Sequence, residues 1–388
     1  MHSSPSNRVV FLDWLRGVAA IIMIQGHAFD AFTRLDARNS GFFIYSQFVG
    51  GEAAAIFLLL TGVTYALGMN RRQELPPWKR VTAALHRARY LFLLAVIFRL
   101  QNWIFDYPRS HVADLLKVDI LNLMGAAAAL LSLLALANGM NRVRWAFFAG
   151  VGIACASPLV SMLGTSMLDT SHLPDAIRNY VVPNGDAFSI FPWGAFLAFG
   201  VAVGSLIPLI QRTEWNRVMQ WSALLGFALL FGGQYFSNLP YSLYPKSDFW
   251  LNSPGLVFCK LGVALLLGSG AYLWTEYLST GWSFVRQLGT TSLVVYWTHV
   301  SLIYGRLFAD YHQTLGIGQT IAVALSMIVL MLGVSLAFKR IQWHLIPQAI
   351  GWRRAVPGNL YTLPSQRAHA VNDEVNDAEV VAPARRRL

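Results

Sequence analysis

Charged residues are scarce in this chain. Only 13% of its 388 residues are Asp, Glu, Lys or Arg, whereas 55% are hydrophobic, and soluble globular domains typically contain about 25% charged residues. Apolar runs long enough to cross about 30 Å of hydrocarbon recur along the chain. The composition therefore excludes a large soluble domain and predicts one integral membrane domain.

Cysteine is also rare, and its positions exclude two kinds of chemistry. Cys155 and Cys259 both fall inside apolar runs, where a thiol behaves as a small hydrophobic group. We therefore expect neither a disulfide framework nor a metal site. The net charge of +11 resides mainly in short connecting segments and the C-terminal tail, as membrane topology requires. It does not indicate a nucleic-acid partner.

The hydrophobic pattern predicts an all-α, polytopic transmembrane helix bundle of about ten spans. Lys and Arg are enriched in the segments that lie inside if the N-terminus is inside, which predicts two cytoplasmic termini. We expect a membrane domain over residues 1–345 and a cytoplasmic tail over 346–388, disordered from about residue 365. Glycines at 50, 51, 62, 194, 200 and 204 are expected to allow close helix packing. The predicted spans are 9–31, 47–69, 83–105, 118–138, 143–164, 188–210, 217–236, 254–275, 285–305 and 317–338.

Polar and ionisable residues interrupt several spans. Each charge costs about 3 kcal/mol at the bilayer centre, so such residues usually line a cavity or pair with one another. Because successive spans cross the bilayer in alternating directions, the position of each residue in its span gives its depth. Most of these polar residues fall in the outer half of the bilayer, which predicts a polar chamber open to the outside. An alternative for Lys260 and Arg99 is an ion pair with Asp119 or Glu52 that holds spans together. The chamber candidates are Glu52, Arg99, Asn102, Asp119, Asn122, Lys260 and Tyr296.

Two histidines are candidates for proton transfer. His27 is followed by Asp30 on the same helix face, and a carboxylate so placed can orient an imidazole that acts as a general base. His299 lies in the ninth predicted span. The alternative for His27 is a hydrogen-bonded packing residue. The catalytic candidates are His27, Asp30 and His299, and Glu52 and Asp119 compete for the role of base.

Asp13 and Arg16 lie near the inner end of the first span and share a helix face. They can satisfy each other as an ion pair, or Arg16 can meet an anionic group that enters from the cytoplasm. Arg16 and His27 are eleven positions apart, about 16 Å along a helix. One helix therefore connects the inner end with the predicted chamber.

Motifs occur in order along these spans, at residues 11–17 with 26–27, 56–63, 119–125, 191–194 and 288–299. They resemble those of the transmembrane acyltransferase superfamily, in particular bacterial relatives of heparan-α-glucosaminide N-acetyltransferase. Arg16 and His27 also have the spacing of the first-helix motif of acyltransferase-3 proteins, in which ten residues separate an arginine from a histidine. The resemblance covers residues 8 to 340.

The resemblance implies an enzyme that moves an acetyl group from cytoplasmic acetyl-coenzyme A to a sugar outside. Arg16 and Asp13 are then expected to bind the coenzyme and His27 to act on the acetyl group or the acceptor. The animal lysosomal enzyme uses a histidine between its first two helices, and residues 31–51 contain none. The histidine of that enzyme therefore has no counterpart in the segment that links the first two predicted spans of this chain.

The resulting hypothesis is a multi-pass acyltransferase of the cell membrane with acetyl-coenzyme A as co-substrate and a carbohydrate or glycolipid as acceptor. His27 would act as a general base or carry an acyl intermediate. A transporter of a small polar or lipid-linked solute is the alternative, because intramembrane charges also bind transported solutes. A membrane scaffold would leave the polar chamber unexplained.

Overall fold

The computed structural model describes residues 9–166, 175–185, 187–241, 243–244, 246–278 and 281–349. Regular structure within these ranges is helical, apart from an isolated bridge between Thr33 and Leu315. The α-helices are α1 (Val10–Phe32), α2 (Gly41–Gly50), α3 (Glu52–Asn70), α4 (Pro77–Phe105), α5 (Ile120–Leu131), α6 (Gly139–Ser166), α7 (Asp175–Val181), α8 (Ile190–Leu206), α9 (Trp215–Ser237), α10 (Pro254–Leu273), α11 (Phe284–Thr290), α12 (Ser292–Ile303) and α13 (Ile317–Ala349). The short elements are η1 (Leu35–Ala37), η2 (Val112–Leu116), η3 (Ser132–Leu136), η5 (Ile207–Leu209), η6 (Arg212–Glu214), the π-helical η7 (Trp274–Leu278) and η8 (Arg306–Tyr311).

Seven helical stretches in the described part of the chain are long and apolar enough to cross a membrane, and the protein is a multi-pass membrane protein. The other three expected spans are helical too, as α1, α9 and the pair α11 and α12. The total of ten crossings and the cytoplasmic side of the termini stay predictions. The expected disordered tail lies outside the described residues. The seven stretches are Gly41–Asn70, Pro77–Phe105, Val112–Leu136, Gly139–Gly164, Ile190–Leu209, Pro254–Leu278 and Ile317–Gln342.

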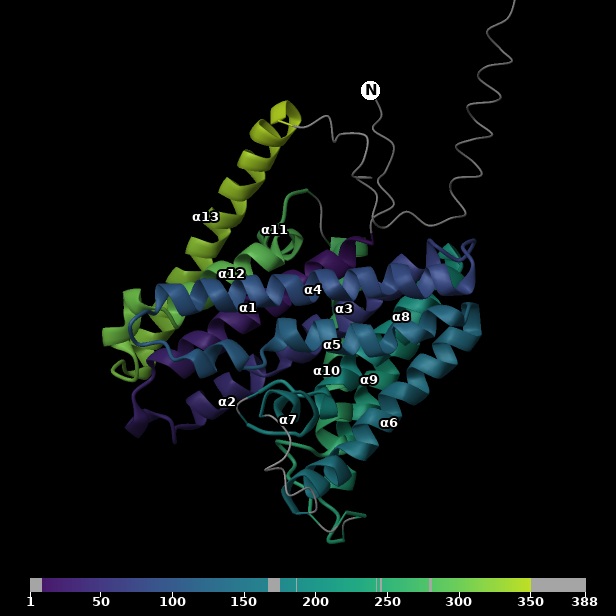
Figure 1. Cartoon of the computed structure of the whole chain (residues 1–388), viewed down its shortest axis with the longest axis horizontal. Helices are drawn as coiled ribbons and strands as arrows, with labels where there is room; N and C mark the ends of the chain where they lie inside the picture. Colours follow the sequence, from purple (N-terminus) through teal and green to yellow (C-terminus); the bar gives the residue numbers. More distant parts are fainter. Residues whose placement is uncertain are drawn as a thin grey trace, which may run out of the picture.

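Helix α1 occupies the centre of one half of the bundle, where it packs against α2, α3, α10, α11, α12 and α13 (Figure 1). Two crossings depend on glycine. A Cβ on Gly17 of α1 or on Gly289 of α11 would collide with a backbone carbonyl oxygen of the other helix. A Cβ on Gly26 would lie only 2.8 Å from the Cα of Gly50 in α2. The backbone of α1 is therefore in direct contact with neighbours at both crossings.

The other half of the bundle is built around α3 and α8, which pack closely along their lengths. The expected role of three glycines is confirmed here. A Cβ on Gly62 of α3, or on Gly200 or Gly204 of α8, would collide with backbone atoms of the opposite helix. Gly194 has more room, because the nearest atom would be 3.3 Å away on the Ile190 side chain.

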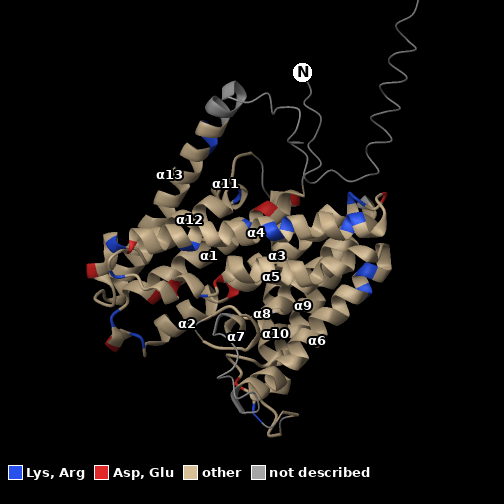
Figure 2. Ribbon diagram, in the orientation of Figure 1, with Lys and Arg blue, Asp and Glu red and all other residues tan. Residues whose placement is uncertain are grey.

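Lys, Arg, Asp and Glu gather near the helix ends, and the bodies of the helices are mostly free of them (Figure 2). Arg142 lies in the first turn of α6 and is nevertheless 0% exposed. Its guanidinium donates to the carbonyl oxygens of Leu134 and Ala137 and to Oδ1 of Asn70. It thereby satisfies the carbonyl groups left open where η3 ends, which gives this buried cation a structural role.

Candidate active site

A polar pocket of about 610 Å³ lies between the C-terminal part of α4, η2, the start of α5 and the end of α12. Four of the expected chamber residues line it: Arg99, Asn102, Asp119 and Tyr296. We call this cavity the polar pocket. The ion pair of Lys117 Nζ with Asp114 Oδ1, at 2.7 Å, forms part of its wall on the η2 side.

Arg99 and Asp119 form an ion pair within the polar pocket, with 3.3 Å between Nε and Oδ2. We call these two residues the pocket pair. Asp119 is also the N-cap of α5, where its Oδ1 accepts from the backbone N–H of Asn122 at 3.0 Å. The Asn122 amide in turn donates to the Tyr180 hydroxyl at 3.1 Å, and burial raises the pKa of Tyr180. Helix capping thus holds the carboxylate of the pocket pair in position.

A strip of hydrogen bonds joins α4 to α12 beside the pocket. Trp297 donates to Oε1 of Gln101 at 2.5 Å, and the amide of Gln101 donates to Ser301 at 3.2 Å. Ser301 donates to Oδ1 of Asn102 at 2.8 Å. Asn102 and Ser301 both line the polar pocket, so this strip fixes the orientation of polar groups that a ligand would meet.

Glu52 and Lys260 do not line the polar pocket, which corrects the expectation of a single chamber. They form a separate ion pair between α3 and α10, with 3.1 Å between Nζ and Oε1. Their side chains are only 8% and 4% exposed, for Lys260 and Glu52 respectively. We call them the sealed pair. The alternative interpretation, in which charges pair to hold helices together, is therefore the one that describes these two residues.

His27 of α1 and His299 of α12 are brought into direct contact, with 3.0 Å between Nδ1 of His27 and Nε2 of His299. Nδ1 of His299 lies 2.6 Å from the carbonyl oxygen of Val295. A carbonyl only accepts, so His299 must carry its proton on Nδ1 and, as a neutral ring, accept at Nε2. His27 then donates from Nδ1, which leaves the lone pair of its Nε2 available for chemistry.

Asp30 does not orient His27 in this structure. Its Oδ2 accepts from the Tyr304 hydroxyl at 2.9 Å, and His299 occupies the hydrogen-bonding position beside His27. The reason is that the His27 ring turns toward α12, whereas Asp30 is exposed at the end of α1. The expected pairing of His27 with Asp30 is therefore wrong, although both contact the same tyrosine: the ring of Tyr304 lies 5.5 Å from that of His27.

Two tyrosines separate the histidines from the polar pocket. Tyr296 and Tyr304 line the pocket, and the ring of Tyr296 lies 6.0 Å from that of His299. The histidine pair therefore lies directly behind the pocket wall. His299 is 0% exposed, whereas His27 is partly exposed. Of the two histidines, His27 is thus the more accessible.

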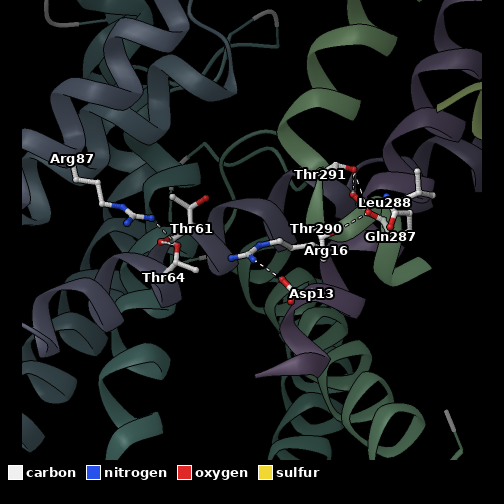
Figure 3. Close-up of polar contacts among 9 residues, drawn as sticks. All are labelled: Asp13, Arg16, Thr61, Thr64, Arg87, Gln287, Leu288, Thr290 and Thr291. Carbon is white, nitrogen blue, oxygen red and sulfur yellow. Dashed lines mark hydrogen bonds and ion pairs between the residues drawn. The ribbon is translucent and has the colours of Figure 1, made fainter. Parts of the chain in front are cut away.

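The other end of α1 carries Arg16, which pairs with Asp13 at 3.2 Å between NH1 and Oδ1. Figure 3 shows the Arg16 guanidinium extending from α1 in the direction of Thr61 and Thr64 of α3. Arg87 of α4 approaches the same threonines and donates to Thr64 Oγ1 at 3.4 Å. The ion pair expected of Asp13 and Arg16 is thus present, and a second arginine lies beside the same part of α3.

Arg87 and Tyr304 are the main residues that sequence reasoning missed. Arg87 belongs to a segment rich in basic residues, which indicates membrane topology rather than a site. Tyr304 lies at the end of the ninth predicted span, where an aromatic residue is ordinary. Tyr304 follows Val300 by one turn at the end of the helix that carries His299. This proximity to His299 was the available signal.

The helices and the pocket define a multi-pass membrane protein with ionisable groups in its interior. The chain matches the family model described as heparan-alpha-glucosaminide N-acetyltransferase, catalytic, over residues 8–236. This is more than half of the chain, and the protein belongs to this family of membrane acetyltransferases. The match includes α1 and the pocket pair, whereas His299 and Tyr304 lie beyond it. No curated protein matches the chain.

Proposed function

We propose that this protein transfers an acetyl group from cytoplasmic acetyl-coenzyme A to a hydroxyl or amine of a sugar-containing acceptor at the outer face of the cell membrane. The arrangement of α1 carries the proposal. Arg16 lies at one end of this helix and His27 about 16 Å further along. The family relation supplies acetyl transfer as the reaction class.

The donor would bind with its phosphates near Arg16 and Arg87. Guanidinium groups bind phosphate with paired, charge-assisted hydrogen bonds, and Asp13 would hold Arg16 in place through their ion pair. From that end the pantetheine arm would run along α1, so that the thioester reaches His27. Arg16 and Asp13 are therefore proposed as coenzyme-binding residues.

The acceptor would lie in the polar pocket, with its reacting group facing His27 past Tyr304. Nε2 of His27 takes the proton of the acceptor hydroxyl or amine, and the freed lone pair attacks the thioester carbonyl. The new bond joins the acceptor oxygen or nitrogen to the acetyl carbon, and the carbon–sulfur bond breaks. The proton then passes from His27 to the coenzyme A thiolate. In a two-step variant the acetyl group rests first on His27.

His299 would act through His27 rather than on the substrate. By accepting from His27 Nδ1, it keeps Nε2 of His27 as the basic nitrogen and fixes the ring orientation. In many catalytic sites the acceptor that orients the imidazole is a carboxylate. Here the acceptor is a second imidazole, which is itself held by a backbone carbonyl.

The test is incorporation of labelled acetyl from acetyl-coenzyme A into the glycan and glycolipid pool of membranes with and without this protein. We expect a labelled product that His27→Ala reduces by at least about 100-fold, with insertion and thermal stability kept. His86→Ala, at an exposed histidine of α4, is the matched control. Full activity of His27→Ala would exclude His27 as the base.

A transporter remains the second candidate, because the structure shows interrupted helices that the sequence did not clearly indicate. Helix α2 ends at Gly50 and α3 begins at Glu52, and Thr291 separates α11 from α12. Breaks of this kind accompany solute sites in transporters. Absence of labelled product from correctly inserted protein, together with measurable solute flux in vesicles, would favour this candidate.

A further inference from the structure

An apolar groove of about 400 Å³ lies against η8, the short helix that directly follows the pocket residues Tyr304 and Gly305. Its walls come from Phe32 at the end of α1, Phe308 and Tyr311 of η8, and Val323 and Met327 of α13. We call this cavity the apolar groove. Gln319 is the main polar side chain along it, so it offers little to a water-soluble ligand.

The groove borders the lipid-facing surface of α13. Leu325 and Val329 of this helix are 59% and 69% exposed, and in a membrane-spanning helix such residues contact hydrocarbon. Ala322, which lines the groove, is exposed on the same helix. The groove therefore opens toward the lipid-facing surface, where a hydrocarbon chain would suit its apolar walls.

A single short segment contributes residues to both cavities. Tyr304 and Gly305, just before η8, line the polar pocket, whereas Phe308 within η8 lines the apolar groove. At about 2 Å rise per residue in a 3-10 helix, Gly305 and Phe308 are about 6 Å apart along the chain. One molecule with a polar head and an apolar tail can therefore occupy both cavities.

The segment that contributes to both cavities carries a cation. Arg306 is exposed, and its NH1 donates to the carbonyl oxygen of Tyr107 at 2.9 Å, which directs the guanidinium along the rim near the pocket. Asp310 is the acidic residue of the same segment and lies four positions further on, past Phe308. Along the chain, a residue of the polar pocket is thus followed by a cation and then by a residue of the apolar groove. This order matches that of a sugar, a phosphate and a hydrocarbon chain in one molecule.

We propose that the acceptor is a sugar joined through phosphate to a membrane lipid. Its hydrocarbon chain occupies the apolar groove, its phosphate lies at Arg306, and its sugar lies in the polar pocket with the reacting group facing His27. This inference rests on the proposed function and names the acceptor class for it. Acetylation then takes place before the sugar leaves its lipid carrier.

The experiment uses the full chain in vesicles with labelled acetyl-coenzyme A and two matched series of hexosyl and hexosaminyl phosphates. One series carries a long isoprenoid chain and the other a methyl group. We expect the isoprenoid acceptors to be preferred by at least about tenfold in kcat/KM, because the chain holds the acceptor in the bilayer beside the groove and raises its effective concentration at the pocket. Equal values for the two series, or preference for a polymeric glycan, would overturn the inference while leaving acetyl transfer intact.

Two variants locate the tail and the phosphate. Ala322→Trp fills the groove from an exposed position and should raise KM for the isoprenoid acceptors about tenfold without affecting the methyl acceptors. Val329→Trp, on the same lipid-facing surface but outside the groove, is its control. Arg306→Gln should raise KM for both series, because both carry phosphate. Equal effects of the two tryptophan variants would overturn the placement of the tail, and no transfer to any acceptor would instead refute the proposed function.

Discussion

The sealed pair and the pocket pair contain the same kinds of charge but lie in different surroundings. Lys260 and Glu52 are enclosed between α3 and α10, and Oε2 of Glu52 has no hydrogen-bond partner among the described residues. Arg99 and Asp119 face a cavity of about 610 Å³. The pocket pair therefore borders space that a ligand can fill, whereas the sealed pair is enclosed by protein.

The difference also shows how each pair is held. In the sealed pair, each buried charge has lost its hydration, and its partner is the main group that offsets this cost. The pocket pair has additional support: Asp119 caps α5 through Asn122, and water or a ligand in the pocket can solvate both groups. Loss of one partner should thus affect folding in the first case and binding in the second.

The largest effect should come from breaking the sealed pair. Lys260→Met leaves the Glu52 carboxylate without its cation in the interior and should cost about 3–5 kcal/mol of stability. The double variant Lys260→Met with Glu52→Gln removes both charges. It should recover most of the stability that the single variant loses. Thermal unfolding in detergent, followed by tryptophan fluorescence, measures both. Equal stability of the single variant and the parent would show that the pair does not hold α3 and α10 together.

A smaller effect, on binding rather than folding, should follow from Asp119→Asn. Asparagine retains the N-cap of α5, so the melting temperature should change little. Loss of the charge beside Arg99 should raise KM for the acceptor about tenfold. Acceptor titrations in the labelled-acetyl assay measure this change. Asp36→Asn, in an exposed pair with Arg34, is the control, and a similar KM in both variants would contradict a role for the pocket pair.

The smallest effect should come from Tyr304→Phe. The ring that lies against His27 is kept, and only the hydrogen bond to Asp30 is lost, which is worth about 1 kcal/mol. We expect a few-fold lower kcat/KM and a loss of stability of no more than about 1 kcal/mol. Tyr90→Phe, at an exposed tyrosine of α4, is the control for loss of a hydroxyl. An unchanged rate would show that the Asp30 contact does not position the pocket wall.

Much of the fold could be predicted from the sequence, because hydrophobic length and turn residues determine where membrane helices lie. Each predicted span is helical in the structure. The breaks at Gly50–Gly51 and Thr291 were not predicted, since the apolar runs continue across them. Hydropathy averages over a window and does not detect a local change of helix axis.

The site could be predicted as a set of residues but not as a set of contacts. Depth along each span placed Arg99, Asn102, Asp119 and Tyr296 together correctly. Depth does not give the rotation of a helix about its axis, which depends on packing. For that reason Glu52 was wrongly assigned to the same chamber.

His27 shows the same limit within one helix. The i,i+3 spacing places Asp30 on the same face of α1 as His27. The packing of neighbouring helices, however, decides which partner each side chain meets. The partner of His27 comes from α12, 272 positions away. No local pattern contains that information.

The glycine crossings of α1 have a consequence for how the reaction proceeds. Contacts between backbones at Gly17 with Gly289 and at Gly26 with Gly50 leave no side chains that could change rotamer to accommodate sliding or turning. Rotation of α1 would require both neighbouring helices to move away at once. We therefore expect α1 and His27 to keep their positions during the reaction. The flexible pantetheine arm of the donor would be the part that moves along α1.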